Sequence, residues 1–119
     1  MYEVKVVDEF SGAHNLRNYK GKCEALHGHN WKVELMLESD TLDSQGMVMD
    51  FKELKDKLKD ILSPLDHKYL NDIPYFKEKN PTSENIARFI HKKLSEILKG
   101  KIKISVWETT ASCASFEKS

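Results

Sequence analysis

Three histidines near the start of the chain have the residue types and the spacing of a metal site. His27 and His29 are separated by one residue, and His14 lies upstream of them. Alternate side chains of extended backbone point to the same side, so the imidazoles of His27 and His29 would face one way. Three imidazole nitrogens with a fourth position left open form the ligand set of a catalytic zinc ion. The alternative is that these histidines are exposed polar residues of a loop, in which Gly28 permits a turn.

The two cysteines of the chain, Cys23 and Cys113, are too few for a disulfide framework. Cys23 lies four residues before His27 and would sit near a bound metal without ligating it. A thiol acts as a base or nucleophile when nearby positive charge lowers its pKa. Cys23 is therefore either such a thiol or a small residue that fills a loop, and Cys113 is interpreted as a packing residue.

Two further positions carry groups that could work beside a metal. Asp66 directly precedes His67, and a carboxylate that orients an imidazole allows that ring to move protons. Glu108 ends an apolar strand and is followed by the hydroxyl of Thr109, an arrangement suited to binding the guanidine-like edge of a heterocycle at two points. Each also has a plainer interpretation, as a surface ion pair and as a solvated charge.

The elements that would position these groups follow from hydrophobic periodicity. Alternation of apolar and polar residues predicts strands over residues 2–10, 30–38, 102–108 and 113–116. Apolar residues at helical spacing predict one helix from an Asp50 cap to Ser63 and another from a Thr82 cap toward Gly100. The first helix would bury Phe51, Leu54, Leu58, Ile61 and Leu62, and the second a stripe that runs from Ile86 to Leu98. Residues 15–28 and 66–74 are expected to be loops.

The order ββααββ predicts an α+β fold, a four-stranded antiparallel sheet with both helices on one face. Such a sheet has two edges, and pairing of edges between subunits, closing an oligomeric barrel, would remove them. We therefore expect a homo-oligomer.

Composition limits the other classes of function. The 119 residues predict one domain, residues 1–119, and the 19 basic and 19 acidic residues give a net charge of zero. This balance argues against a nucleic-acid partner held by a basic surface and against a polybasic membrane anchor. No apolar run has the length of a membrane span, and the N-terminal residues lack the apolar segment of a signal peptide, so we expect a cytoplasmic protein with no membrane partner.

Six motifs in order along the whole chain resemble those of the 6-pyruvoyltetrahydropterin synthase / 6-carboxytetrahydropterin synthase family. They are Phe10-Ser11-Gly12-Ala13-His14, Cys23-Glu24-Ala25-Leu26-His27-Gly28-His29, Gly46-Met47-Val48-Met49-Asp50-Phe51, Leu65-Asp66-His67-Lys68-Tyr69-Leu70-Asn71, Pro81-Thr82-Ser83-Glu84-Asn85 and Trp107-Glu108-Thr109. The resemblance implies the tunnelling fold, in which subunits close a barrel and commonly form a hexamer of two trimers. It also implies active sites between subunits.

The resemblance implies a role for each matching residue. The histidines His14, His27 and His29 would bind Zn²⁺. Cys23 would be the catalytic thiol, and Asp66 and His67 would be its acid/base partners. Glu108 would anchor the pterin ring, and the supporting residues would be Thr82, Glu84 and Thr109. The substrate of the family is 7,8-dihydroneopterin triphosphate. In the queuosine branch, which we favour, the products are 6-carboxy-5,6,7,8-tetrahydropterin, acetaldehyde and triphosphate.

Glu24 leaves the branch open. Family members of folate synthesis cleave the same substrate to 6-hydroxymethyl-7,8-dihydropterin and carry a Glu three residues before the His-x-His, and this chain has both that Glu and Cys23. A second carboxyl near zinc offers an alternative acid or base. The 6-pyruvoyl-tetrahydropterin activity of the animal-type branch and a non-catalytic metal-binding module are further alternatives.

Overall fold

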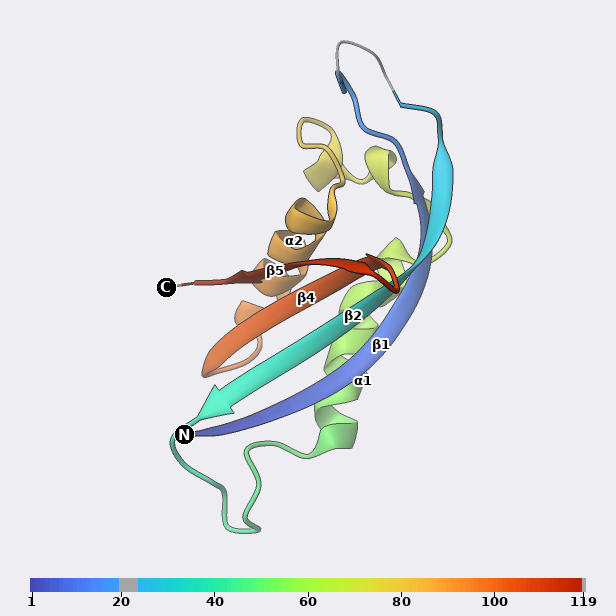
Figure 1. The fold of residues 1–119 in the computed structure, drawn as a ribbon. Coiled ribbons are helices and arrows are strands. Elements are labelled where there is room, and N and C mark those ends of the chain that lie inside the picture. Colours follow the sequence, from blue (N-terminus) through green and yellow to red (C-terminus); the bar gives the residue numbers. More distant parts are fainter. Residues whose placement is uncertain (20–23, 119) are drawn as a thin grey trace.

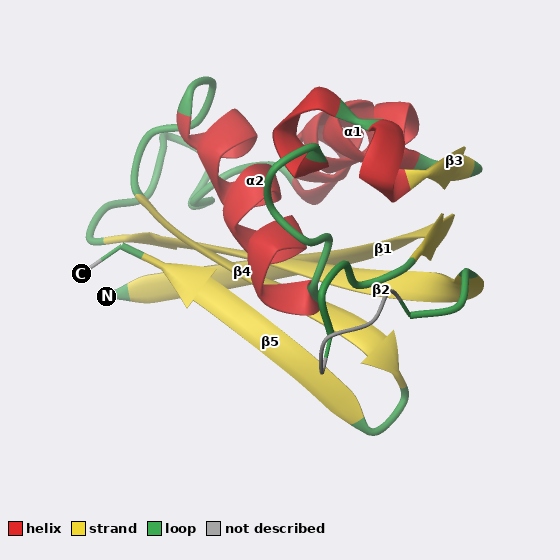
Figure 2. Cartoon of the chain, turned by 90° about the horizontal axis from the view of Figure 1, so that it is seen from above, coloured by secondary structure: helices red, strands yellow, loops and turns green. Residues whose placement is uncertain are grey.

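A five-stranded sheet forms one layer of the molecule and two helices form the other. The computed structural model describes residues 1–19 and 24–118. The strand order is β3-β1-β2-β4-β5, and both helices cover the same face of the sheet (Figures 1 and 2). The elements are β1 (Tyr2–His14), β2 (His27–Ser39), α1 (Phe51–Leu62), β3 (Lys68–Tyr69), α2 (Ser83–Ser95), β4 (Lys101–Thr109) and β5 (Ser112–Glu117), with short 3-10 turns at Ser63–Leu65, Leu70–Asp72 and Pro74–Phe76.

The predicted α+β class is confirmed, and the sheet differs from the prediction by one short strand. β3 lies within the segment predicted as a loop and pairs in parallel with Gly12 and Ala13 of β1, so the sheet is mixed rather than purely antiparallel. The backbone N–H of Ser11 donates to Asp66 Oδ1, and the backbone N–H of His67 donates to the Ser11 carbonyl. These bonds dock the segment on β1. A strand of two residues is too short to produce any hydrophobic period.

The strands that carry the histidines are longer than predicted. β1 and β2 each span 13 residues, and their antiparallel register continues to the pair His14↔His27. The prediction ended both strands where apolar alternation stops, but backbone pairing continues through the polar residues beyond that point.

Three other predictions are corrected. Helix α2 ends at Ser95 rather than near Gly100, so Ile97 is 51% exposed although Leu98 is buried. Phe51, predicted on the buried stripe of α1, is exposed at the first residue of that helix. Cys113, interpreted as a packing residue, is exposed on β5.

Buried side chains from the sheet and the helices form one apolar cluster between the two layers. Helix α1 contributes Leu54, Leu58 and Leu62, and β2 contributes Trp31, Val33, Leu35 and Leu37. Full burial of one such side chain stabilises the fold by about 1.5–3 kcal/mol. Among the helices of the described residues, none is long and apolar enough to span a bilayer.

Both predicted helix caps are present. Asp50 accepts a hydrogen bond from the backbone N–H of Lys52, and the Thr82 hydroxyl accepts one from the backbone N–H of Asn85. Each cap satisfies a backbone donor that has no partner within its helix. The N-terminus of α2 is thereby fixed beside the end of β1, where the histidines lie.

Gly100, which precedes β4, lies where the backbone of β2 approaches closely, and a substitution there can test this packing. Its φ is +105°, and a Cβ added there would lie 2.9 Å from the carbonyl oxygen of Glu38. Gly46 is the matched control, because its φ is +83° but a Cβ would meet nothing within 4 Å. Left-handed backbone costs a residue with a Cβ about 1–2 kcal/mol. We expect Gly46→Ala to lose about that much stability in urea unfolding and Gly100→Ala to lose clearly more; equal losses would contradict the close approach to Glu38.

Candidate metal centre

The register of β1 and β2 brings the three histidines together. His14 lies opposite His27, and Gly12 lies opposite His29. His27 and His29 are two residues apart in one strand and therefore point to the same side, as the sequence predicted. The centroid of the His14 ring is 4.6 Å from that of His27 and 5.2 Å from that of His29. The His27 and His29 centroids are 4.8 Å apart.

The hydrogen bonds of two of these rings fix which nitrogen faces the centre. His14 Nδ1 lies 2.8 Å from the Pro81 carbonyl oxygen, and His27 Nδ1 lies 3.0 Å from that of Ala25. A carbonyl can only accept, so both Nδ1 atoms carry the hydrogen, and in the neutral rings both Nε2 atoms carry lone pairs. These two Nε2 atoms are 3.0 Å apart. Two lone pairs at that distance repel each other unless a proton or a cation lies between them.

His29 supplies the third nitrogen. Its Nε2 is buried and has no hydrogen-bond partner within the described residues. A buried polar atom without a partner is costly and calls for an explanation such as an ion. Imidazole is a favoured ligand of Zn²⁺, and metal-bound histidines usually donate their other N–H to a carbonyl or carboxylate. The donor set and its orientation therefore fit a divalent cation such as zinc.

Glu108 adds a carboxylate to the cluster. Its Oε1 lies 3.2 Å from His14 Nε2 and 3.5 Å from His29 Nε2. One ligand atom from each of these residues and from His27 lies within 4.8 Å of every other. Glu108 follows the buried residues Ile104 and Val106 at intervals of two in β4, so it continues the row that faces the helices. The family resemblance implied a role for Glu108 at the pterin ring, and in the structure its carboxylate also lies against the imidazoles.

The indole of Trp31 forms the floor of the cluster. It is fully buried and contacts the rings of His14 and His29 edge-on, at centroid distances of 4.9 and 5.2 Å. Burial lowers the pKa of His29; the charge of Glu108 raises it, and the neighbouring rings of His14 and His27 lower it. A lowered pKa favours the neutral imidazole, which is the form that binds a metal. Trp31 continues the two-residue period of His27 and His29 along β2, which is why it lies under their rings.

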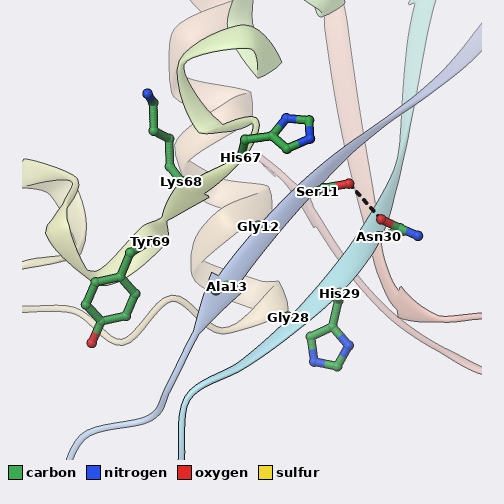
Figure 3. A pocket seen from close by; sticks show the side chains of 9 residues that line it. All are labelled: Ser11, Gly12, Ala13, Gly28, His29, Asn30, His67, Lys68 and Tyr69. Carbon is green, nitrogen blue, oxygen red and sulfur yellow. Dashed lines mark hydrogen bonds between the residues drawn. The ribbon is translucent and has the colours of Figure 1, made fainter.

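Asp66 and His67 lie at the outer edge of β1, apart from the four-residue cluster. His67 Nδ1 is 3.0 Å from Asp66 Oδ2, so the carboxylate contacts the ring. The backbone N–H of Ser11 holds the pKa of Asp66 below its usual value, and His67 lowers it further. The His67 side chain is 81% exposed. The backbone of His67 has a φ of +59°. Figure 3 shows its ring beside Ser11 at one end of an open pocket of about 520 Å³ and His29 at the other end.

Cys23 and Glu24 precede His27 in the sequence, and each was predicted to act as an acid or base near the metal. Cys23 lies outside the described residues. Glu24 Oε1 is 3.8 Å from His27 Nδ1 and accepts a hydrogen bond from the backbone N–H of Leu16. The carboxylate of Glu24 therefore lies beside a ring of the cluster but does not contact its centre.

The supporting residues of the predicted site are dispersed. Thr82 uses its hydroxyl to cap α2 directly after Pro81, so it lies near His14 through the backbone. Glu84 is exposed in the first turn of the same helix. The exposed Thr109 accepts a hydrogen bond from the backbone N–H of Ala111 with its hydroxyl. Their roles toward a substrate stay predictions.

Comparison with known proteins identifies the family. The model of the family described as 6-pyruvoyl tetrahydropterin synthase matches residues 3–119. The chain belongs to this family. It is 41% identical over 113 residues to a 6-carboxy-5,6,7,8-tetrahydropterin synthase of Synechocystis sp., covering 90% of this chain and 86% of the relative. A human 6-pyruvoyl tetrahydrobiopterin synthase is 38% identical over 105 residues, covering 83% and 72%.

Solved structures of the family agree with this assignment. The 6-pyruvoyl tetrahydropterin synthase of Caenorhabditis elegans superposes with a TM-score of 0.85 at 27% identity, covering 99% of this chain and 96% of that one. The Plasmodium falciparum protein of the same name gives 0.84 at 26% identity, covering 98% and 97%. The chain is therefore a pterin synthase enzyme, as the resemblance of its motifs implied.

The bond from Ser11 to Asp66 predicts a specific response of stability to acid. The folded-state pKa of Asp66 lies below the ordinary aspartate value of 3.8, so on acidification the unfolded chain takes up this proton first. The ionised Asp66 therefore adds to the free energy of unfolding above pH 3.8, and this stabilisation is lost as the pH falls through the folded-state pKa. An asparagine does not titrate in this range. We therefore expect the free energy of unfolding in urea to fall less between about pH 5 and about pH 3 for Asp66→Asn than for the wild type. Parallel curves for the two proteins would contradict the assignment.

Proposed function

We propose that the protein is a zinc-dependent 6-carboxy-5,6,7,8-tetrahydropterin synthase of queuosine and 7-deazapurine biosynthesis. It would convert 7,8-dihydroneopterin triphosphate to 6-carboxy-5,6,7,8-tetrahydropterin, acetaldehyde and triphosphate. The observation that carries the proposal is the convergence of three imidazole nitrogens, two of them fixed by carbonyl bonds at Nδ1. Support for the branch comes from relatives of that name, 41% and 33% identical to the chain.

His14, His27 and His29 would hold the metal through Nε2. A bound Zn²⁺ supplies a Lewis acid that makes substrate hydroxyls more acidic and polarises a neighbouring carbonyl. The chain itself contributes a dry floor at Trp31, which strengthens the electrostatic interactions above it.

Proton transfer falls to Cys23 and to His67. The reaction reduces the pterin ring at the expense of its side chain, so protons must leave side-chain carbons and reach the ring. Cys23 as a thiolate would accept one proton, and His67, oriented by Asp66, would donate or accept the other. Asp66 contacts Nδ1, and the side chain is largely exposed, so Nε2 would be the nitrogen that meets an incoming molecule.

Glu108 would fix the pterin ring. Its contacts with the imidazoles are made by Oε1, which leaves Oε2 to accept hydrogen bonds from the N–H groups of the ring. Since the same carboxylate lies at the metal centre, a ring held there places its side chain close to the metal, which is a gain in positioning. Thr82, Glu84 and Thr109 remain supporting candidates.

We also propose that the active site is shared between subunits of a hexamer built from two trimers. Within the described residues, the outer edges of β5 and of β1 before Ser11 have no partner strand. Unpaired edges are usually covered, and closing a barrel covers them. His67 lies beside such an edge and is largely exposed, and we propose that its ring would serve the metal site of a neighbouring copy.

The identity of the pterin product tests the proposed reaction. Zinc-loaded protein incubated with 7,8-dihydroneopterin triphosphate should give the 6-carboxy product and acetaldehyde, as measured by mass spectrometry and an aldehyde assay. The metal-depleted protein should be inactive, and zinc should restore it. Unchanged substrate at full metal occupancy would reject the proposal.

The same assay separates the alternatives. A 6-hydroxymethyl product would indicate the folate branch, for which the position of Glu24 beside His27 is the structural argument. A 6-pyruvoyl product would indicate the activity named for the human relative. Glu24→Gln should abolish a 6-hydroxymethyl product and spare a 6-carboxy product.

Mixing two inactive variants tests whether subunits share the site. Cys23→Ala and His67→Asn should each bind zinc like the wild type but turn over no substrate. When the two are co-expressed, random assembly restores both groups in about a quarter of the sites if these come from different subunits. We expect that recovery of activity in mixed oligomers; no recovery would place Cys23 and His67 in the same subunit's site. Zinc binding with unchanged turnover in Cys23→Ala would instead support a non-catalytic role for the thiol.

A further inference from the structure

Side-chain amides continue the pairing of β1 beyond the point where β3 ends. β3 pairs with β1 at Gly12 and Ala13, and Asn71 follows shortly after β3. The backbone N–H of Asn15 donates to Asn71 Oδ1 at 3.1 Å, and Asn71 Nδ2 donates to the Asn15 carbonyl at 2.9 Å. The amide group thus pairs with both backbone groups of one residue, as a neighbouring strand would.

Asn80 repeats this arrangement two residues further along. The backbone N–H of Arg17 donates to Asn80 Oδ1 at 2.9 Å, and Asn80 Nδ2 donates to the Arg17 carbonyl at 3.0 Å. The carbonyl of Leu16, between Asn15 and Arg17, accepts instead from the backbone N–H of Glu24, so Asn71 and Asn80 pair with alternate residues of the segment. Two amides from separate segments therefore clamp the chain just after His14.

The Arg17 side chain closes the segment that leads to Asn80. Its guanidinium donates to the Phe76 carbonyl and, at 3.1 Å, to the Lys79 carbonyl. Arg17 thus contacts this segment through its side chain at two carbonyls and through its backbone at Asn80. The segment is tied to the end of β1 at three points.

The Asn80 clamp leads directly to the carbonyl that orients His14. Asn80 precedes Pro81, and its own carbonyl accepts hydrogen bonds from the backbone N–H of Thr82 and from Asn85 Nδ2, both at 2.8 Å. Pro81 is therefore held between the Arg17 clamp and the start of α2. Its carbonyl oxygen receives the Nδ1 hydrogen of His14, whose side chain is almost fully buried.

We infer that Asn80 is a positioning residue for His14. By fixing the Pro81 carbonyl, Asn80 sets the tautomer and orientation of the His14 ring and so aims Nε2 at the centre of the cluster. The consequence for metal binding rests on the proposed function; the consequence for the ring does not. Loss of such an outer contact typically weakens metal binding 10- to 100-fold.

Asn71 provides the matched control. It makes the same pair of backbone bonds, at Asn15, but none of its hydrogen bonds reaches the segment from Asn80 to Thr82. Asn71→Ala should therefore lower thermal stability and leave the bond from His14 to Pro81 in place. Asn80→Ala should remove the two side-chain bonds to the Arg17 backbone and so loosen Pro81 on that side, while the bonds of the Asn80 carbonyl remain. Asn80→Asp, which keeps the acceptor for the Arg17 N–H, serves as the second variant if the alanine variant does not fold.

The experiment measures the ring and the metal separately. In metal-free protein we expect the His14 Nδ1–H resonance, protected from water by Pro81, in imidazole-selective NMR spectra of the wild type and Asn71→Ala. It should broaden or vanish in Asn80→Ala. The zinc dissociation constant, measured by competition with a chelating indicator, should rise about 10- to 100-fold in Asn80→Ala and change by less than about threefold in Asn71→Ala.

Two results would overturn the inference: an unchanged His14 resonance and zinc affinity in the Asn80 variants, or equal changes in the Asn80 and Asn71 variants. If wild-type protein shows the resonance but binds no zinc, the proposed function fails. The positioning of the ring by Asn80 would then still be decided by the NMR comparison.

Discussion

The register between β1 and β2 sets the whole arrangement, because it decides which side chains share a face. His27, His29 and Trp31 follow one another at intervals of two in β2, and the next residues in that row are buried in the core. A slip of one residue would turn all of them to the other face of the sheet. Apolar burial along the row therefore pins the register, and the register carries the histidines to their places opposite His14 and Gly12. The candidate metal centre is in this sense an extension of the core.

Because the histidines adjoin the buried core, their protonation states are set by burial and by fixed neighbouring groups. Because Trp31 excludes water beneath the rings, the charged form of His29 is disfavoured and its pKa is lowered. The carbonyl bonds at Nδ1 of His14 and His27 select the tautomers that leave Nε2 unprotonated. Glu108 supplies negative charge beside three neutral ligands. Burial, tautomer and charge thus favour the same occupant, a divalent cation.

Much of this could be predicted from the sequence, and the limits have physical causes. Period-two patterns predicted the common face of His27 and His29, and capping residues predicted the starts of both helices. Motifs predicted the family. β3 was missed because two residues carry no period, and the carbonyls of Ala25 and Pro81 were missed because backbone groups leave no mark on residue identity. Asn71 and Asn80 lay within quoted motifs or beside them, but only the fold shows that each amide pairs with a distant backbone.

The clamp at the end of β1 also limits how another chain can add to that edge. Ser11 has both backbone groups occupied by Asp66 and His67, and the amides occupy Asn15 and Arg17. Within the described residues, the part of this edge that has no partner strand runs from Tyr2 to Phe10, and there the backbone N–H of Glu9 already donates to Asp8 Oδ1. In the proposed hexamer, a strand of a neighbouring copy on this edge would therefore end before Ser11, which would leave Asp66 and His67, the proposed acid/base pair, open at the end of that contact.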